Sequence, residues 1–247
     1  MDNNELRSEK LLASADPRYF AIDKYGGGLS MIISSYKKTL DFVIPSMPSM
    51  CLNISLQSHL SSKKIPKDRR FIQRPTNNEY LDNANTLFNY FELRIQSIIF
   101  AYTAIESWSN FIIKNEGSKS NFEFKLKKGK SEINLTDLNI IERQSLKLKI
   151  KKIIPEIMKS SSLPKPLHQK FIDLEKIRDR IIHLKTDDSI DCIYMEEKNR
   201  ITLWTTLLNS SDTLFSDTAF EIMKFFTETS KLKSTKPNWL KKYPYQI

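Results

Sequence analysis

The stretch NNEYLDNANTLFNYFELRIQSIIFAYTAIESWSNFIIKNE (Asn77–Glu116) decides the fold of this chain. Its apolar residues recur at steps of three and four, which is the spacing of one face of an α-helix. The spacing predicts one long, largely buried helix that begins with Asn77 or Asn78 as its N-cap and stops before Gly117.

Several shorter segments repeat this helical spacing. They predict a helix from about Pro166 to Leu184, a final helix from about Asp212 to Leu232, and one or two helices in Leu135–Met158 with Thr136 as a cap. FEFKLKK (Phe122–Lys128) alternates like a short extended piece, and YMEEKNRITLW (Tyr194–Trp204) is typical of a short hairpin or loop. The chain has only five glycines in 247 residues. The predicted fold is therefore all-α, and it allows one short hairpin.

The chain divides into three parts by its sequence pattern. Residues 1–75 read as a mixed N-terminal extension of unclear role, with a possible helix from about Leu29 to Val43 before Pro45 and Pro48. Residues 76–232 form the predicted helical domain, and residues 233–247 form a basic C-terminal tail.

The charge of the chain favours an anionic partner. The formal net charge is +10 and the pI is about 9.4, and nucleic acid is the commonest partner of a basic domain. Lysines cluster in KLKKGK (Lys125–Lys130), KLKIKK (Lys147–Lys152) and the tail (Lys231–Lys242). The alternative is that these are ordinary solvated faces, because an AT-rich genome also produces 29 Lys against 10 Arg.

The sequence gives no sign of a membrane or an oxidising compartment. No run approaches the length of an apolar membrane span, and the N-terminus has no signal-peptide pattern. Cys51 and Cys192 stand alone, without metal-ligand spacing, and are expected to be buried thiols. A cytoplasmic protein with no membrane partner is the prediction.

The residues with the clearest chemistry lie in FIDLEKIRDRIIHLK (Phe171–Lys185). On an ideal helix Asp179 and His183 lie about 40° apart, so the carboxylate can hold the imidazole. Arg178 lies about 140° from His183. These two converge only if the helix frays, Arg178 bends back, or a second subunit contributes, and a dimer is the favoured reading.

The pattern R-D-x-x-x-H resembles the R-x4-6-H signature of the HEPN superfamily of helical ribonucleases. Ile98–Glu116 is similar to the long first helix of that family. The segment Ser160–Lys185, in which a loop with two prolines runs into the motif helix, is similar to HEPN proteins of bacterial defence and toxin systems. The resemblance covers roughly Asn77–Lys231 and implies a HEPN-like helical bundle.

The resemblance implies a metal-independent endoribonuclease that needs no cofactor. A ribose 2′-OH attacks the adjacent phosphorus, which leaves a 2′,3′-cyclic phosphate and a 5′-hydroxyl. His183 is then the acid/base group, Arg178 stabilises charge on the phosphoryl oxygens, and Asp179 orients His183 or Arg178.

Further residues have weaker expected roles in that site. Glu106 is either a polar group that reaches the Arg178/His183 pocket, or a salt-bridge or exposed residue, and Asn110 is a second possible support. Arg180 and Lys185 either grip RNA phosphates or are solvated surface charges.

The expected partners are RNA, a second copy of the chain, and an antitoxin or another protein of a defence system. The predicted role is a toxin or antiphage-defence effector. Two alternatives stay open: a non-catalytic HEPN-like dimeric module that binds RNA, nucleotide or a partner protein, and a plain helical protein.

Overall fold

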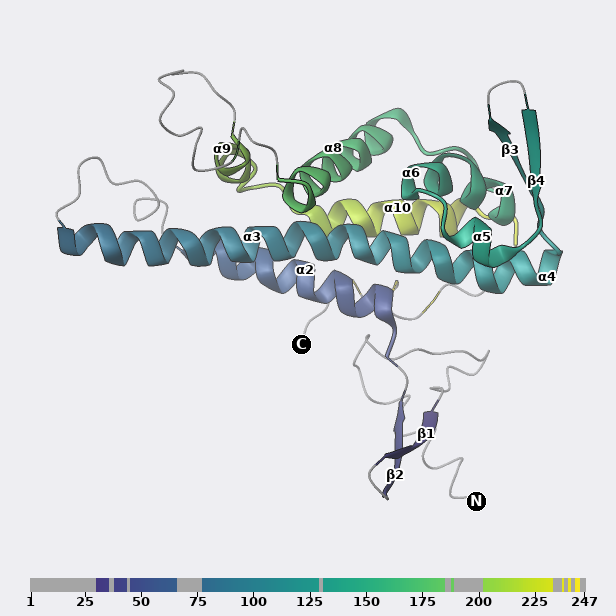
Figure 1. Ribbon diagram of the computed structural model, residues 1–247, viewed down its shortest axis with the longest axis horizontal. Helices are drawn as coiled ribbons and strands as arrows, with labels where there is room; N and C mark the ends of the chain where they lie inside the picture. Colours follow the sequence, from purple (N-terminus) through teal and green to yellow (C-terminus); the bar gives the residue numbers. More distant parts are fainter. Residues whose placement is uncertain are drawn as a thin grey trace. The chain divides into compact units, whose positions relative to one another are not determined.

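The computed structural model describes residues 30–35, 38–43, 45–65, 77–128, 131–184, 188, 202–232, 237, 240 and 243–244. These residues are mostly helical, which confirms the predicted all-α class (Figure 1). The chain divides into two compact units. Unit 1 comprises Met1–Met50, Ala104–Leu163 and Phe220–Ile247, and unit 2 comprises Cys51–Thr103 and Pro164–Ala219.

The long helix α3 spans Asn77–Ile112 and begins where the sequence predicted. Helical structure continues through the π-helical segment η2 (Ile113–Gly117) and α4 (Ser118–Ser120), so the predicted stop before Gly117 was wrong. Gly117 is buried with φ −63°, and a Cβ there would lie 3.3 Å from Leu138 Cδ2. This glycine therefore serves close packing, and the helix ends at Asn121, whose φ of 46° is a conformation that Asn tolerates.

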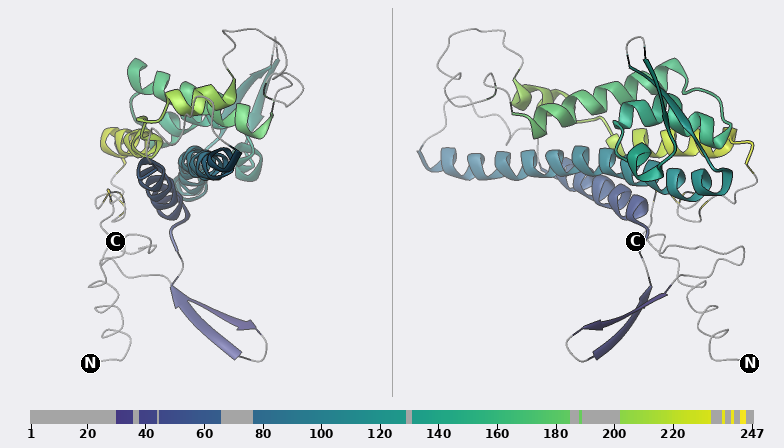
Figure 2. Two further views of the ribbon diagram at one scale, coloured as in Figure 1. Left: turned by 90° about the vertical axis from the view of Figure 1, so that its left-hand side faces the viewer. Right: turned by 45° about the vertical axis from the view of Figure 1, so that its right-hand side comes forward.

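Two antiparallel hairpins belong to unit 1 (Figure 2). β1 (Ser30–Ser35) pairs with β2 (Lys38–Val43), so the helix predicted from Leu29 to Val43 was wrong. The β-branched and aromatic residues of this stretch favour extended backbone, and no helical cap precedes it. β3 (Phe124–Lys128) confirms the predicted extended piece and pairs with β4 (Ser131–Leu135).

Short helices follow the second hairpin. α5 (Leu138–Glu142) begins after Asp137, whose Oδ1 accepts the N–H of Asn139 at 2.8 Å, so the N-cap is Asp137 and not Thr136 as predicted. A carboxylate is at least as good a cap as a hydroxyl. α6 (Leu146–Leu148), the π-helical segment η3 (Lys149–Ile153) and α7 (Ile154–Met158) then form one continuous stretch. Together with α5, this stretch agrees with the one or two helices predicted in Leu135–Met158.

The core of unit 1 joins α3, η3 and α10 (Phe215–Thr229). Trp108 of α3 stacks on Phe226 of α10 with ring centroids 6.1 Å apart. Ile105, Ile150 and Ile222 are fully buried in the same unit. The chain after α10 is held by the Ser230 hydroxyl, which donates to the Met158 carbonyl at 2.9 Å.

Unit 2 contains most of α2 (Met47–Lys63), the first three quarters of α3, α8 (Lys165–Ile182), α9 (Leu203–Asn209) and the start of α10. Helix α2 lies beside α3 (Figure 1), where the Ser55 hydroxyl donates to the Ser97 carbonyl at 2.7 Å. The sequence did not predict α2, because serines fill much of its buried face: Ser49, Ser55, Ser58 and Ser62. A helix with so little apolar contrast has no visible stripe.

The hairpin predicted at Tyr194–Trp204 falls mostly outside the described residues. Its last residues, Leu203 and Trp204, begin α9, and Thr202 caps that helix by accepting the N–H of Thr205 at 3.1 Å. Cys51 is buried as predicted, and Cys192 lies outside the described residues. No helix in the described ranges is long and apolar enough to cross a membrane.

A buried cation ties the helices of unit 2 together. Arg94 of α3 has no exposed surface. Its guanidinium bonds to His59 Nδ1 of α2 at 2.6 Å and donates to the Ser210 carbonyl, between α9 and α10, at 2.6 Å. It also lies over the Phe215 ring at 5.4 Å. One side chain thus connects α2, α3, the α9–α10 loop and α10.

His59 must be neutral for this arrangement to exist. Its Nδ1 has to accept a hydrogen bond from the Arg94 guanidinium, because a guanidinium can only donate. Burial, followed by the charges of Arg94 and Lys63, lowers the pKa of His59 to about 4 from an ordinary value of 6.5. The nearby carboxylate of Asp212 opposes this shift.

This pair makes the fold acid-sensitive. Because the folded-state pKa of His59 lies below its unfolded value, its contribution to stability is present above pH 6.5 and is lost as the pH falls towards 4. We expect protonation to cost up to about 3 kcal/mol in the free energy of unfolding. Urea unfolding at pH 7 and pH 4.5 measures this loss.

The matched variant is His59→Gln, whose amide oxygen can accept from Arg94 but does not titrate. Its unfolding free energy should fall less between the two pH values than that of the parent protein. Equal losses in both proteins would show that other groups cause the acid sensitivity.

Candidate functional site

Helix α8 carries the predicted motif and ends within it. Pro164 precedes the helix and Pro166 lies in its first turn, where a proline costs no hydrogen bond. The helix ends at Ile182, and His183 has φ −113° and ψ 70° while its N–H still donates to the Asp179 carbonyl at 2.8 Å. His183 is therefore the C-cap residue of α8, and the chain leaves the helical path after it.

Arg178 is held from two directions. Its Cζ lies 4.6 Å from the centre of the Tyr102 ring, on α3 within the same unit. Its Nη1 donates to Asp179 Oδ1 at 2.9 Å. The side chain is 29% exposed, so the guanidinium is oriented and still reachable from solvent.

Asp179 and His183 differ in their partners. The Asp179 carboxylate, 51% exposed, pairs with Arg178, which is one of the two roles expected for it. The His183 side chain is exposed at the end of α8, next to exposed Ile182 and Leu184. An exposed imidazole can exchange a proton with solvent or with a bound hydroxyl group.

Arg180 has a structural partner that the sequence analysis did not foresee. Its Nε and Nη2 each donate at 2.8 Å to the two carboxylate oxygens of Asp188, a side chain with no exposed surface. Asp188 Oδ1 also accepts the N–H of Leu203 at 2.6 Å. Arg180 therefore fastens the start of α9 to α8, a role different from both the phosphate contact and the solvated charge that were considered.

Removing Arg180 should destabilise the fold. Arg180→Ala removes the cation that faces the buried Asp188 carboxylate, and breaking a buried ion pair typically costs about 3 to 5 kcal/mol. Denaturant unfolding monitored by circular dichroism gives the difference.

Lys176→Ala is the matched control, because Lys176 is an exposed cation on the same helix. We expect it to change the unfolding free energy by less than about 0.5 kcal/mol. If the two variants are equally stable, the pair between Arg180 and Asp188 does not hold unit 2 together.

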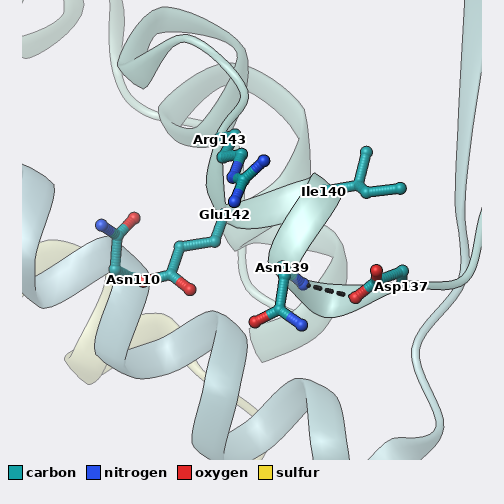
Figure 3. A pocket seen from close by; sticks show the side chains of 6 residues that line it. All are labelled: Asn110, Asp137, Asn139, Ile140, Glu142 and Arg143. Carbon is teal, nitrogen blue, oxygen red and sulfur yellow. Dashed lines mark hydrogen bonds between the residues drawn. The ribbon is translucent and has the colours of Figure 1, made fainter.

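The two residues expected to support the pocket, Glu106 and Asn110, belong to unit 1. The reach of Glu106 towards Arg178 and His183, which belong to unit 2, stays a prediction. Asn110 lines a different hollow of about 540 Å³, together with residues in and around α5 (Figure 3): Asp137, Asn139, Ile140, Glu142 and Arg143.

A buried lysine lies next to this hollow. Lys149 is 1% exposed, and its Nζ donates to Asn110 Oδ1 at 2.6 Å. Burial lowers its pKa, while the carboxylates of Glu106 and Glu142 act in the opposite direction. The Glu106 carboxylate therefore acts on the charge of Lys149 inside unit 1, and both alternatives for Glu106 stay predictions.

Sequence reasoning missed two residues that shape the motif region. Tyr102 was assigned only to the apolar stripe of α3, and no local signal shows that its ring face receives Arg178. Asp188 lies beyond the motif and outside any regular pattern, so nothing marks it as the partner of Arg180. Lys185 lies outside the described residues.

Comparisons with protein-family models, curated proteins and solved structures gave no match to this chain. Among the described residues, no group of three or more His, Cys, Asp or Glu side chains is arranged to hold a metal ion.

Proposed function

We propose that the chain is a HEPN-type endoribonuclease that cleaves RNA without a metal ion. The observation that supports this best is the end of α8, where an oriented guanidinium and an exposed imidazole lie five positions apart in sequence. A permanent cation suits the charge that builds on phosphoryl oxygens, and an imidazole suits proton transfer near neutral pH.

In the proposed reaction, His183 removes the proton from a ribose 2′-OH. The freed oxygen attacks the adjacent phosphorus, and the bond from phosphorus to the 5′-oxygen breaks. The 5′-oxygen takes up a proton, so the products are a 2′,3′-cyclic phosphate and a 5′-hydroxyl. Arg178 donates hydrogen bonds to the phosphoryl oxygens, and Asp179 holds Arg178 in place.

A homodimer would supply a second acid/base group to the proposed reaction. The reaction needs a base for the 2′-OH and an acid for the leaving oxygen, and His183 can serve only one role at a time. A second copy brings a second imidazole. The exposed apolar side chains of Ile182 and Leu184, 49% and 55% exposed beside His183, are of the kind that subunit contacts cover.

Exposed lysines of unit 1 are proposed to contact the RNA backbone. Lys147, Lys151 and Lys152 are exposed, whereas Lys149 of the same cluster is buried. The cluster therefore offers three cations to solvent rather than four. Phosphate contacts of this kind add affinity without sequence preference.

The proposed setting is the cytoplasm, with the protein acting as a toxin or an antiphage-defence effector that a partner protein restrains. The competing proposal is a non-catalytic HEPN-like dimeric module that binds RNA, nucleotide or a protein. What favours that alternative is the hydrogen bond to Asp179, which already takes a donor of Arg178.

The first test is the loss of the acid/base group. His183→Ala should lower RNA cleavage by about 10²- to 10⁴-fold, because a methyl group transfers no proton. Purified parent and variant are compared on cellular RNA in the presence of EDTA, with 2′-deoxy oligonucleotides as a substrate that should remain intact. His168→Ala, a change of the other histidine on α8, should cleave at the parent rate.

If EDTA abolishes RNA cleavage by the parent protein, the metal-free mechanism is wrong. Equal cleavage by parent and His183→Ala would remove His183 from the site. A parent protein that binds RNA but never cleaves it would favour the non-catalytic module.

The second test concerns the dimer. Light scattering should give a mass near twice 28.9 kDa. If each cleft uses both histidines, mixing parent with an excess of His183→Ala should reduce activity per parent chain, whereas mixing with His168→Ala should not. A monomer that cleaves at full rate on dilution would contradict the shared cleft.

A further inference from the structure

We infer that Tyr102 is a positioning residue that holds the Arg178 guanidinium ready for an RNA phosphate. The inference rests on the proposed function, because it takes phosphate as the group that Arg178 binds. It adds a residue from α3 to a site that the motif places on α8 alone.

The ring of Tyr102 is a fixed surface. Tyr102 is 7% exposed, and its neighbours along the buried face of α3, Ile98, Ala101 and Ile105, have no exposed surface. A side chain packed in this way cannot change rotamer without disturbing the helix contact. The distance of 4.6 Å from Arg178 Cζ to the ring centre lies well inside the range of a cation–π contact, about 6 Å.

The contact with Tyr102 leaves N–H donors of the Arg178 guanidinium available for a phosphate. The contact is to the face of the Tyr102 ring, which interacts with the positive charge of the guanidinium. The N–H donors of the group remain its means of hydrogen bonding. Asp179 takes a donor of Nη1. A phosphate that approaches the other nitrogens can therefore accept hydrogen bonds while the Arg178 charge stays over the Tyr102 ring.

This arrangement lowers the entropy lost on binding. A freely moving Arg must give up its rotamer freedom when it grips a phosphate, and an Arg already held against a ring gives up less. Asp179 alone is a weaker hold, because its carboxylate is 51% exposed and exposed ion pairs contribute little. Tyr102 is the more rigid of the two contacts.

The experiment measures binding of a short 2′-O-methyl RNA, which cannot be cleaved, by fluorescence anisotropy at physiological salt. We expect Arg178→Ala and Tyr102→Leu each to weaken binding by about tenfold. The double variant should bind no more weakly than Arg178→Ala, because Tyr102 acts through Arg178. Tyr102→Phe keeps the ring face and should bind within about twofold of the parent.

Phe91→Leu is the control for general damage to α3. Phe91 is a buried aromatic residue of the same helix and packs against Trp204, with ring centroids 5.0 Å apart. This variant should lose stability but keep the parent affinity. Equal weakening by Phe91→Leu and Tyr102→Leu, or additive losses in the double variant, would overturn the positioning role.

Binding and cleavage separate this inference from the proposed function. One outcome is that the parent and its Arg178 and Tyr102 variants bind the uncleavable RNA with the expected relative affinities, while the parent leaves ordinary RNA intact. That result would contradict the ribonuclease proposal and support the role of Tyr102. A parent protein whose binding does not change in Arg178→Ala would overturn the role of Tyr102, whatever its cleavage activity.

Discussion

The permanent charge on Arg94, a side chain with no exposed surface, constrains every helix packed around it in unit 2. Such a cation is tolerated only where acceptors surround it. Helix α2 has to present a neutral ring nitrogen at His59, and the α9–α10 loop has to present the carbonyls of Ser210 and Thr213. The order of these helices is thus fixed by polar geometry, whereas apolar packing alone would accept several arrangements.

Apolar spacing predicted the helices that bury a clear stripe and missed those that do not. Helices α3, α8 and α10 were predicted to within a few residues at most of their ends, because their inward residues are large and apolar. The serine-faced helix α2 has no such contrast. The strands at Ser30–Val43 contain apolar residues at spacings that fit both a helix and a strand. An apolar pattern of this length does not distinguish a helix from a strand. The sequence pattern predicted that the helix ends before Gly117, but in the structure this glycine lies within helical structure and allows close packing against Leu138.

The candidate site was predictable only as far as contacts are local. The pair of Arg178 and Asp179 joins neighbours in sequence, so the motif alone suggested it. The partners of Arg178 and Arg180 that come from elsewhere, Tyr102 and Asp188, depend on how α3 and the segment after α8 fold back. The charge of a residue also did not predict whether it is buried. In KLKIKK one lysine, Lys149, turns inward to Asn110, while the other three lysines are exposed.

The π-helical segments Ile113–Gly117 and Lys149–Ile153 each hold one residue more than an α-helix needs for the same rotation. Each is equivalent to a single-residue insertion absorbed within a helix. Deleting one residue inside either segment would return the backbone to α geometry and keep the flanking turns in phase. The same deletion in the middle of α8 would rotate everything after it by about 100° and turn its buried face to water. In the part of the chain that the structure describes, these two segments are therefore places where the length can change by one residue without loss of helical register.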